Sequence, residues 1–398
     1  MRRYKGLERI SKATVNGWVT VERQRWEEST GASVMPVDAW MGLATATVSR
    51  GLCELCCRLN RGATSFAESA EHLWRAAQVK ISREILRQVV QAEGREVLQA
   101  QATRVLPPSF QAQECRTTTP QGQAISRIYE SVDGVKVPTV THAEKKKRRS
   151  KVREKRRKKP KVAQAPQRAL PALRQGADNA WKEVRLVTAY DQTMEHRHVA
   201  GTLGNHEAAG RLLVREARRL GFDAVDEAVA VVDGAPWIQN QFHARKVPVD
   251  ALGLDFYHLS EHIHAARRAV FGEDDAAGQT HAGDLLHTVR HEGYEPFWSQ
   301  LVAWRSGLKS PRKKAAVDGL MQYASAHREM IRYPEFEKNG WQIGSGPMES
   351  MCKTAPRRLK HSGMRWDHRN VDPMLAIECL AQSGQWNLHW KSPASTIT

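Results

Sequence analysis

The apolar run Ala228-Val-Ala-Val-Val232, followed directly by Asp233 and Gly234, constrains the fold of this chain more than any other feature. A continuous apolar run of this length is typical of a strand that is buried on both faces. The preceding sequence predicts a strand over residues 184–188 and a helix over residues 205–220. Strands that alternate with a helix predict a mixed α/β sheet, and such sheets place ligands at the carboxyl ends of their strands, where Asp233 stands.

Two further acidic residues stand at comparable positions. Asp133, also followed by a glycine, ends an alternating strand pattern over residues 127–132, and Glu349 follows Pro347 in the expected first turn of a helix. Mg²⁺ binds through a few carboxylate oxygens plus substrate phosphate, and a pair of such ions can stabilise the attacking and the leaving oxygen of an in-line phosphoryl displacement. The three acids therefore predict phosphodiester cleavage and transfer, although each motif taken singly is also common as a turn or loop.

The charge of the chain favours a polyanionic partner. Its 398 residues carry 61 Lys and Arg against 43 Asp and Glu, a formal net charge of +18 at pH 7. Phosphate neutralisation with counterion release dominates nucleic-acid affinity, so nucleic acid is the simplest partner. The sequence contains no long uncharged apolar run, and its first residues lack the apolar core of a signal peptide. We therefore expect a soluble, cytoplasmic protein of two or three domains with no membrane partner.

Residues 1–105 predict a helical region. Ser65 with Glu68 forms a capping-box pattern, and Ser82 can cap a second helix after a short break. Two helices with such a break resemble a helix-turn-helix, whose second helix reads base edges in a major groove. The side chains expected to face outward there are Arg83, Arg87, Gln88 and Gln91. The alternative is a plain helical bundle, and the polar residues 106–126 predict a linker after it.

A basic run covers residues 145–159, with a single acid among them. We expect a loop that leaves the strand next to Asp133 and clamps the DNA backbone through phosphate contacts. The alternative is a solvated, mobile loop. The basic residues assigned to DNA here are Lys145, Lys146, Lys147, Arg148, Arg149, Arg156 and Arg157.

Four segments in order resemble those of bacterial insertion-sequence DDE transposases. They are Asp133-Gly-Val-Lys-Val-Pro138, Asp233-Gly-Ala-Pro-Trp237, Leu254-Asp-Phe-Tyr-His258 and Gly344-Ser-Gly-Pro-Met-Glu349. The chain is most similar to the Kra group, which is related to the Mutator-like superfamily. The resemblance covers residues 129–369 and, more weakly, the helices that precede them.

This resemblance implies an RNase H-like catalytic core that is split by an all-helical insertion between Asp233 and Glu349. On that basis we expect the first part of the core over residues 127–259, the insertion over residues 260–340, and the second part with a basic tail over residues 341–398. Helical patterns over residues 255–268, 283–290 and 312–332 agree with such an insertion.

The resemblance also implies the chemistry. Asp133, Asp233 and Glu349 would be the catalytic residues and would hold two Mg²⁺ or Mn²⁺ ions, so that water and then a 3′ hydroxyl attack scissile phosphates. Asp255 and His258 form an Asp-x-x-His signature that would support the site; the alternative is a helix-start carboxylate and a hydrogen-bonded core histidine.

Basic residues beyond Glu349 would line the DNA path, although Pro356 is expected to kink or stop the helix that carries this acid. They are Lys353, Arg357, Arg358, Lys360, Arg365 and Arg369, with Trp366 suited to stacking on an unpaired base. As a transposase, the chain would cut double-stranded DNA at the ends of a mobile element and join the 3′ ends to target DNA. The resemblance further implies a homodimer or higher oligomer, associated with the bacterial nucleoid.

Two other functions remain open. One is a helix-turn-helix regulator, or an inactive transposase remnant, that binds DNA without cutting it. The other is a zinc peptidase, because His258-Leu-Ser-Glu261-His262 matches the His-x-x-Glu-His pattern, but this interpretation gives no role to the three acids or to the positive charge.

The remaining candidate ligands are cysteines and histidines. Cys53 and Cys56 have the spacing of a zinc knuckle but lie in a helix-like stretch, where core packing is the alternative. The six cysteines are too sparse for a disulfide scaffold and are expected to be reduced. His196 and His198 are expected at the surface or at phosphates rather than as metal ligands.

Overall fold

The structure is a computed structural model that describes residues 2–36, 38, 48–157, 170 and 178–391. The chain divides into two compact units. Unit 1 comprises residues 1–107, 135–184 and 354–398, and unit 2 comprises residues 108–134 and 185–353. Since each unit is assembled from segments far apart in the chain, neither corresponds to one of the expected sequence domains.

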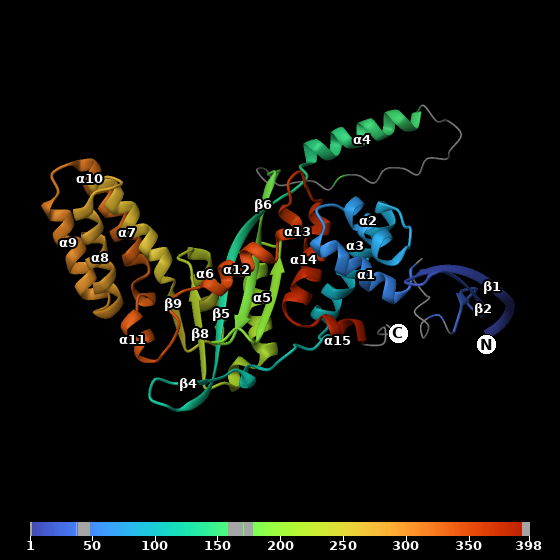
Figure 1. The fold of residues 1–398 in the computed structure, drawn as a ribbon, viewed down its shortest axis with the longest axis horizontal. Helices are drawn as coiled ribbons and strands as arrows, with labels where there is room; N and C mark the ends of the chain where they lie inside the picture. Colours follow the sequence, from blue (N-terminus) through green and yellow to red (C-terminus); the bar gives the residue numbers. More distant parts are fainter. Residues whose placement is uncertain (1, 37, 39–47, 158–169, 171–177, 392–398) are drawn as a thin grey trace. The chain divides into compact units, whose positions relative to one another are not determined.

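A mixed sheet forms the centre of unit 2 (Figure 1). Its strands lie in the order β7-β6-β5-β8-β9, and the short β4 pairs with β5. The bounds are β4 Arg116–Thr118, β5 Ala124–Pro138, β6 Trp181–Tyr190, β7 Arg197–Thr202, β8 Glu227–Val232 and β9 Ala251–Leu254. Strands β5, β8 and β9 pair in parallel, whereas β6 and β7 pair antiparallel. The prediction of a mixed α/β sheet is confirmed, as is the buried strand that leads to Asp233.

Two helices follow the strands of this sheet, α5 His206–Leu220 and α6 Pro236–Arg245. The side chain of Asn205 caps the start of α5, and Gly221 ends the helix with a φ of 77°, a conformation that favours glycine. Leu213, Ala217 and Leu220 of α5 belong to the same buried core as the strand residues of β8. The helix predicted over residues 205–220 is therefore confirmed.

The chain between β9 and α12 (Gly346–Thr354), all of which the structure describes, contains helices only. They are α7 Phe256–Phe271, α8 Ala276–His291, α9 Tyr294–Gly307, α10 Pro311–Ala326 and α11 Tyr333–Lys338. Helices α7 to α10 lie side by side (Figure 1), and their buried apolar side chains, such as Ile263, Leu285 and Leu301, continue the core of unit 2. The three predicted helical patterns correspond to α7, α8 and α10, while α9 was not predicted.

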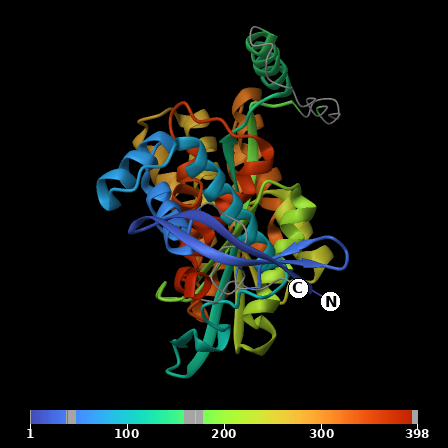
Figure 2. The same cartoon turned by 90° about the vertical axis from the view of Figure 1, so that its right-hand side faces the viewer.

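The N-terminus of unit 1 contradicts the expected helical region. Residues 2–34 form β1 Arg2–Thr14, β2 Gly17–Glu28 and β3 Ser33–Val34, and Figure 2 shows β1 and β2 as a long twisted ribbon. Val15 and Asn16 make the turn between them, and Gly17, which pairs with Thr14 at the start of β2, has a φ of 101°. Asn-Gly between alternating residues is a hairpin signal, and here the glycine supplies the positive φ that the chain adopts as it leaves the turn.

Helices complete unit 1. They are α1 Arg50–Gly62, α2 Phe66–Ala77, α3 Arg83–Ala102, α4 His142–Arg157, α13 Arg357–Lys360, α14 His368–Gln382 and α15 Trp386–Lys391. The predicted caps Ser65 and Ser82 accept backbone hydrogen bonds at the starts of α2 and α3. Helices α3 and α14 pack with their backbones in contact: a Cβ on Gly94 would lie 2.1 Å from the carbonyl oxygen of Pro373. The residues after 353 thus pack with the N-terminal helices.

Three local predictions are wrong. The basic run is helical in α4 rather than a loop; Glu144 in its first turn and Asp178, which accepts from the amide of His142, favour a helix start. The expected linker contains β4 and the start of β5. The strand that carries Asp133 does not end there but continues to Pro138, because Val137 and Pro138 are again buried. Lys158 and Lys159 lie outside the described residues.

Along the part of the chain that the structure describes, none of the helices combines the length and the apolar character that a bilayer crossing demands.

Candidate active site

The pairing of β5 and β8 brings two of the predicted acids together. The two strands are parallel, and the hydroxyl of Ser131 donates to the carbonyl oxygen of Val231 at 2.6 Å. Continuing this alignment by two residues places Asp133 opposite Asp233, just beyond the carboxyl end of β8. Aligned residues of parallel strands point to the same face, so the two carboxylates share one edge of the sheet.

The electrostatics of Asp233 agree with this arrangement. Burial raises the pKa of its carboxyl above the ordinary value, and the nearby charges of Asp133 and Asp255 raise it further. The amide of Ala235, which donates to Asp233 at 3.1 Å, and the nearby His258 oppose this shift. Partly buried carboxylates that repel one another are a favourable environment for a bound cation, because the cation relieves the repulsion.

Asp255 lies at the end of the neighbouring strand and is fully buried. Pairing of β8 with β9 reaches Val232 and Leu254, so Asp233 and Asp255 are the next residue on each strand. One carboxylate oxygen of Asp255 accepts from two amides in the first turn of α7, and the other accepts from the amide and hydroxyl of Ser345. Asp255 therefore ties the loop before α12 to the sheet.

Helix α12 carries Glu349 in its first turn, as predicted. One turn later, the thiol of Cys352 donates to the carboxylate of Asp133 at 3.2 Å. Because residues three positions apart share a helix face, Glu349 belongs to the face that contacts Asp133. The helix ends at Thr354, which confirms the expected effect of Pro356.

The structure does not bring all three acids into one compact ligand set. Glu349 is exposed, and its carboxylate lies 3.6 Å from the amine of Lys353. Among the described residues, the only set of three potential ligand atoms found within 4.8 Å of one another is elsewhere in unit 2. Joint metal ligation by Asp133, Asp233 and Glu349 therefore requires the Glu349 side chain to move toward the two aspartates.

Two residues that the sequence analysis missed, Tyr323 of α10 and His327 just after it, support the turn at Asp233. His327 places one ring nitrogen 2.9 Å from the carbonyl oxygen of Gly234 and the other 2.7 Å from that of Tyr323. A Cβ on Gly234 would lie 2.4 Å from the Tyr323 hydroxyl, so any larger residue at this turn would force the Tyr323 ring to move. The residue types alone gave no signal for this contact, because α10 is far from Asp233 in the chain.

The peptidase motif does not form a zinc site. His258 pairs with Glu261 at 3.6 Å, and the ring of His262 stacks on Tyr323 with 3.7 Å between centroids. Zinc in a catalytic site needs three protein ligands. Among the described side chains, no third ligand joins these two histidines within metal-binding range.

Two residues assigned to the DNA path are instead core residues of unit 1. Trp366 is 4% exposed, and its ring nitrogen donates to the carbonyl oxygen of Leu359 at 3.0 Å. Arg358 is 3% exposed and lies over the rings of Phe66 and Trp366, 4.9 and 5.3 Å from their centroids. These two predictions are wrong, because the apolar indole and the weakly hydrated guanidinium both fill the core.

The other residues assigned to DNA have mixed environments. Lys145 pairs with Asp367 at 2.9 Å, and Arg365 with Glu144 at 2.8 Å. The side chain of Arg156 lies outside the part of the chain that the structure describes. Exposed side chains are Arg83, Lys146, Lys147, Arg148, Arg157, Lys353, Arg357, Lys360 and Arg369. For these the DNA contact stays a prediction.

Helix α3, the expected reading helix, differs from the prediction at two positions. Gln91 is buried rather than outward-facing. Arg87 pairs with Glu84 one turn earlier on the same helix. A base contact by Arg87 would therefore require this ion pair to open.

The remaining candidate ligands from the sequence are the cysteines and His198. All six cysteines are free of disulfides, as predicted. Cys53 donates to Glu93 at 3.3 Å and belongs to no set of three metal-binding groups among the described residues. His198 is buried and bonds Glu216 at 3.0 Å, so its predicted surface position is wrong.

Comparison with known proteins assigns this chain to no family. No protein-family model and no curated protein matches the chain. Among solved structures, it is similar to the Drosophila P element transposase strand transfer complex, with 10% identity and a TM-score of 0.28 over 89% of this chain and 83% of that one. A superposition this weak carries no argument about the present chain.

Proposed function

We propose that this protein is a DNA transposase of an insertion sequence, a polynucleotidyl transferase of the DDE class with Asp133, Asp233 and Glu349 as its catalytic acids. The observation that carries the proposal is the alignment of Asp133 with Asp233 on adjacent parallel strands, with the Glu349 face of α12 held against Asp133 through Cys352. The mixed sheet, with β6 and β7 on one side of β5 and β8 and β9 on the other, fits an RNase H-like core, and α7 to α11 fit the helical insertion.

The donor set fits divalent cations. Hard cations such as Mg²⁺ and Mn²⁺ prefer carboxylate oxygens, and burial together with the charge of Asp133 raises the pKa of Asp233, an effect that a bound cation would oppose. Asp133 and Asp233 would hold one ion together, and Glu349 would complete the second site. When bound, such a pair supplies charge stabilisation at the attacking and leaving oxygens of the phosphate.

The remaining residues of the site act by positioning. Asp255 holds Ser345 and thereby fixes where α12 begins. Cys352 links α12 to β5 through its hydrogen bond to Asp133. His327 fixes the turn that follows Asp233. The excess of positive charge in the chain would attract DNA, because phosphate contacts bind a duplex without reading its sequence.

The test is DNA end cleavage and strand transfer by the full chain with Mg²⁺ or Mn²⁺. We expect Asp133→Asn and Asp233→Asn each to lower the rate by at least about a thousandfold, since each removes a charged ligand, while DNA affinity is retained. Asp250→Asn is the matched control, because this acid contacts the amide of Ala228 at the start of β8, the end of the strand opposite to Asp233. Activity that survives both substitutions would reject the site. DNA binding by the wild type without any cleavage would favour the non-catalytic regulator.

A further inference from the structure

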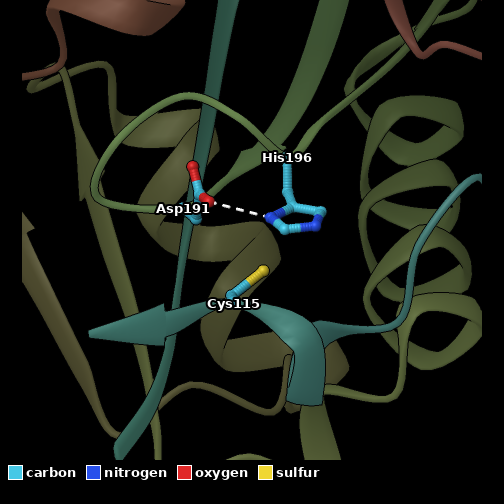
Figure 3. Close-up of side chains that lie close together, drawn as sticks. All are labelled: Cys115, Asp191 and His196. Atoms are coloured by element: carbon cyan, nitrogen blue, oxygen red, sulfur yellow. Dashed lines mark hydrogen bonds and ion pairs between the residues drawn. The ribbon is translucent and has the colours of Figure 1, made fainter.

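A second group of metal-binding side chains lies in unit 2, and it shares no residue with the acids of the candidate active site. The thiol of Cys115, the carboxylate of Asp191 and the imidazole of His196 each place a ligand atom within 4.8 Å of the other two. Figure 3 shows the three side chains converging. Cys115 immediately precedes β4, whereas Asp191 and His196 flank the loop between β6 and β7.

The backbone around these residues is fixed independently of any ligand. Cys115 donates its amide to Ala112 at 3.1 Å and accepts from the amide of Arg127 at 2.8 Å. The loop closes on itself, since the amide of Asp191 donates to the carbonyl oxygen of His196 at 3.1 Å. The ring of His196 packs near that of Phe110, with 5.1 Å between centroids. The three donors are therefore held in place rather than gathered by chance on a mobile surface.

One atom in the group lacks a partner. Asp191 is 4% exposed, and its Oδ2 lies 2.9 Å from Nδ1 of His196 and accepts from Thr193 at 3.2 Å. Its other oxygen, Oδ1, is buried without any hydrogen-bond partner. A buried carboxylate oxygen without a partner is costly, and a bound cation is one of the groups that can satisfy it.

We propose that Cys115, Asp191 and His196 bind a Zn²⁺ ion that joins the segment before β4 to the loop between β6 and β7. Thiolate, imidazole and carboxylate are the three ligand types that zinc uses in proteins, and a thiolate selects against Mg²⁺. Binding replaces the thiol proton of Cys115, which is released to solvent, so that thiolate and carboxylate neutralise the divalent charge. The side chain of His196 is 29% exposed, which gives the ion an entry path and leaves a fourth position for water.

A cysteine nucleophile is the competing explanation for these three residue types. The thiolate is the reactive form of cysteine, and reactive cysteines have a lowered pKa. Burial raises the pKa of the Cys115 thiol to about 12, and the nearby carboxylate of Asp191 adds to this effect. The convergence of three different metal-binding groups within 4.8 Å of one another is the geometric reason to favour a metal ligand set.

The test uses cobalt, which replaces zinc and reports thiolate ligation through a sulfur-to-cobalt charge-transfer absorption. After metal removal, the full chain should bind one Co²⁺ with this absorption, and Zn²⁺ should abolish it. Cys115→Ser should lose the band, and Asp191→Asn should weaken Co²⁺ binding by at least about tenfold. Cys379→Ser, which changes another buried cysteine, should keep it.

Cys352→Ser and Asp133→Asn separate this site from the candidate active site, where Cys352 offers another thiol. Both variants should keep the cobalt band, and Asp133→Asn should keep it even though cleavage is lost. If Cys115→Ser does not fold, the wild type still tests the proposal. Zinc should raise the Tm of the wild type, and it should displace bound cobalt so that the thiolate-to-cobalt absorption disappears. A wild type without this absorption, or a band that disappears in Cys352→Ser but persists in Cys115→Ser, would overturn the proposal.

Discussion

At the scale of single residues, two buried carboxyl groups of unit 2 respond to pH in opposite directions. Glu130 on β5 is fully buried with both oxygens unpartnered, and burial, together with the charge of Glu216, raises its pKa well above 4.5. Burial opposes the ionisation of Glu216, but its hydrogen bond with His198 and the charges of Arg215 and Arg219 lower its pKa to about 2. The two groups therefore form a matched pair for a linkage experiment.

We expect Glu130→Gln to stabilise the protein increasingly as pH rises from 5 to 8. The folded state keeps Glu130 protonated while the unfolded chain ionises above its ordinary pKa, so this group makes the free energy of unfolding fall with rising pH. The decrease amounts to about 1.4 kcal/mol for each pKa unit between the two states. Thermal unfolding at several pH values measures the effect; a Tm difference from wild type that does not grow with pH would contradict it.

Glu216→Gln should have the opposite effect and destabilise the protein, more strongly at neutral than at acid pH. Its lowered pKa contributes stability that is present above the ordinary glutamate pKa and is lost as pH falls through the folded value of about 2. Removing the charge leaves Arg215 and Arg219 without their buried partner. We expect a decrease in the free energy of unfolding of about 3 kcal/mol at pH 7, which shrinks toward acid pH. Chemical denaturation at pH 7 and pH 3 distinguishes this result from a pH-independent packing defect.

Neighbouring arginines of α13 provide a second residue-scale test. Arg358 is buried and donates to the carbonyl oxygen of Asn60 at 3.0 Å, whereas Arg357 is exposed. Arg358→Ala should cost about 2 to 4 kcal/mol, because it leaves a cavity beside Phe66 and Trp366 and removes buried hydrogen bonds. Arg357→Ala should leave the Tm unchanged. If Arg357 contacts DNA, this variant should also have a lower DNA affinity. Equal decreases in Tm for both variants would show that the core assignment of Arg358 is wrong.

At the scale of elements, α4 is the densest concentration of positive charge in the described chain. Lys146, Lys147 and Arg148 in its middle are exposed. If α4 contacts the DNA backbone, replacing these three residues with alanine should weaken binding to all sequences alike. The slope of log affinity against log salt should fall by about 0.9 for each phosphate that α4 no longer neutralises.

The control for α4 removes the same charge elsewhere. Arg75, Arg328 and Arg332 are exposed arginines that already pair with acids, namely Glu71, Glu295 and Glu335. Their replacement with alanine should change the salt slope less than the α4 substitutions do. An equal change would mean that only the net charge of +18, and not α4, directs binding.

At the scale of the whole molecule, all three proposed catalytic acids belong to one unit of one chain. A mixture of Asp133→Asn and Glu349→Gln chains should therefore remain inactive in strand transfer, because neither chain carries a complete site. Wild type mixed with Asp133→Asn should retain partial activity and serves as the control for mixing. Restored activity in the first mixture would show that acids from two chains form one site.

The sequence by itself determined the local elements and the acids that end them. The apolar run before Asp233, the caps at Asn205, Ser65 and Ser82, and the helix start before Glu349 all depend on interactions within a few residues, so their patterns could be recognised. The strands at residues 2–34 and the helix α4 also depend on local signals. These are the Asn16-Gly17 pair at the hairpin turn and Glu144 in the first turn of α4, and both were missed.

Only the tertiary structure decided which distant residues meet. The parallel alignment of β5 with β8 places Asp133 opposite Asp233, and packing of α12 brings Cys352 to Asp133. Packing also buries Trp366 and assembles Cys115 with a loop that lies far along the chain. These contacts depend on strand register and on the filling of a shared core by side chains from many segments, and a single sequence does not encode such long-range choices in any short pattern.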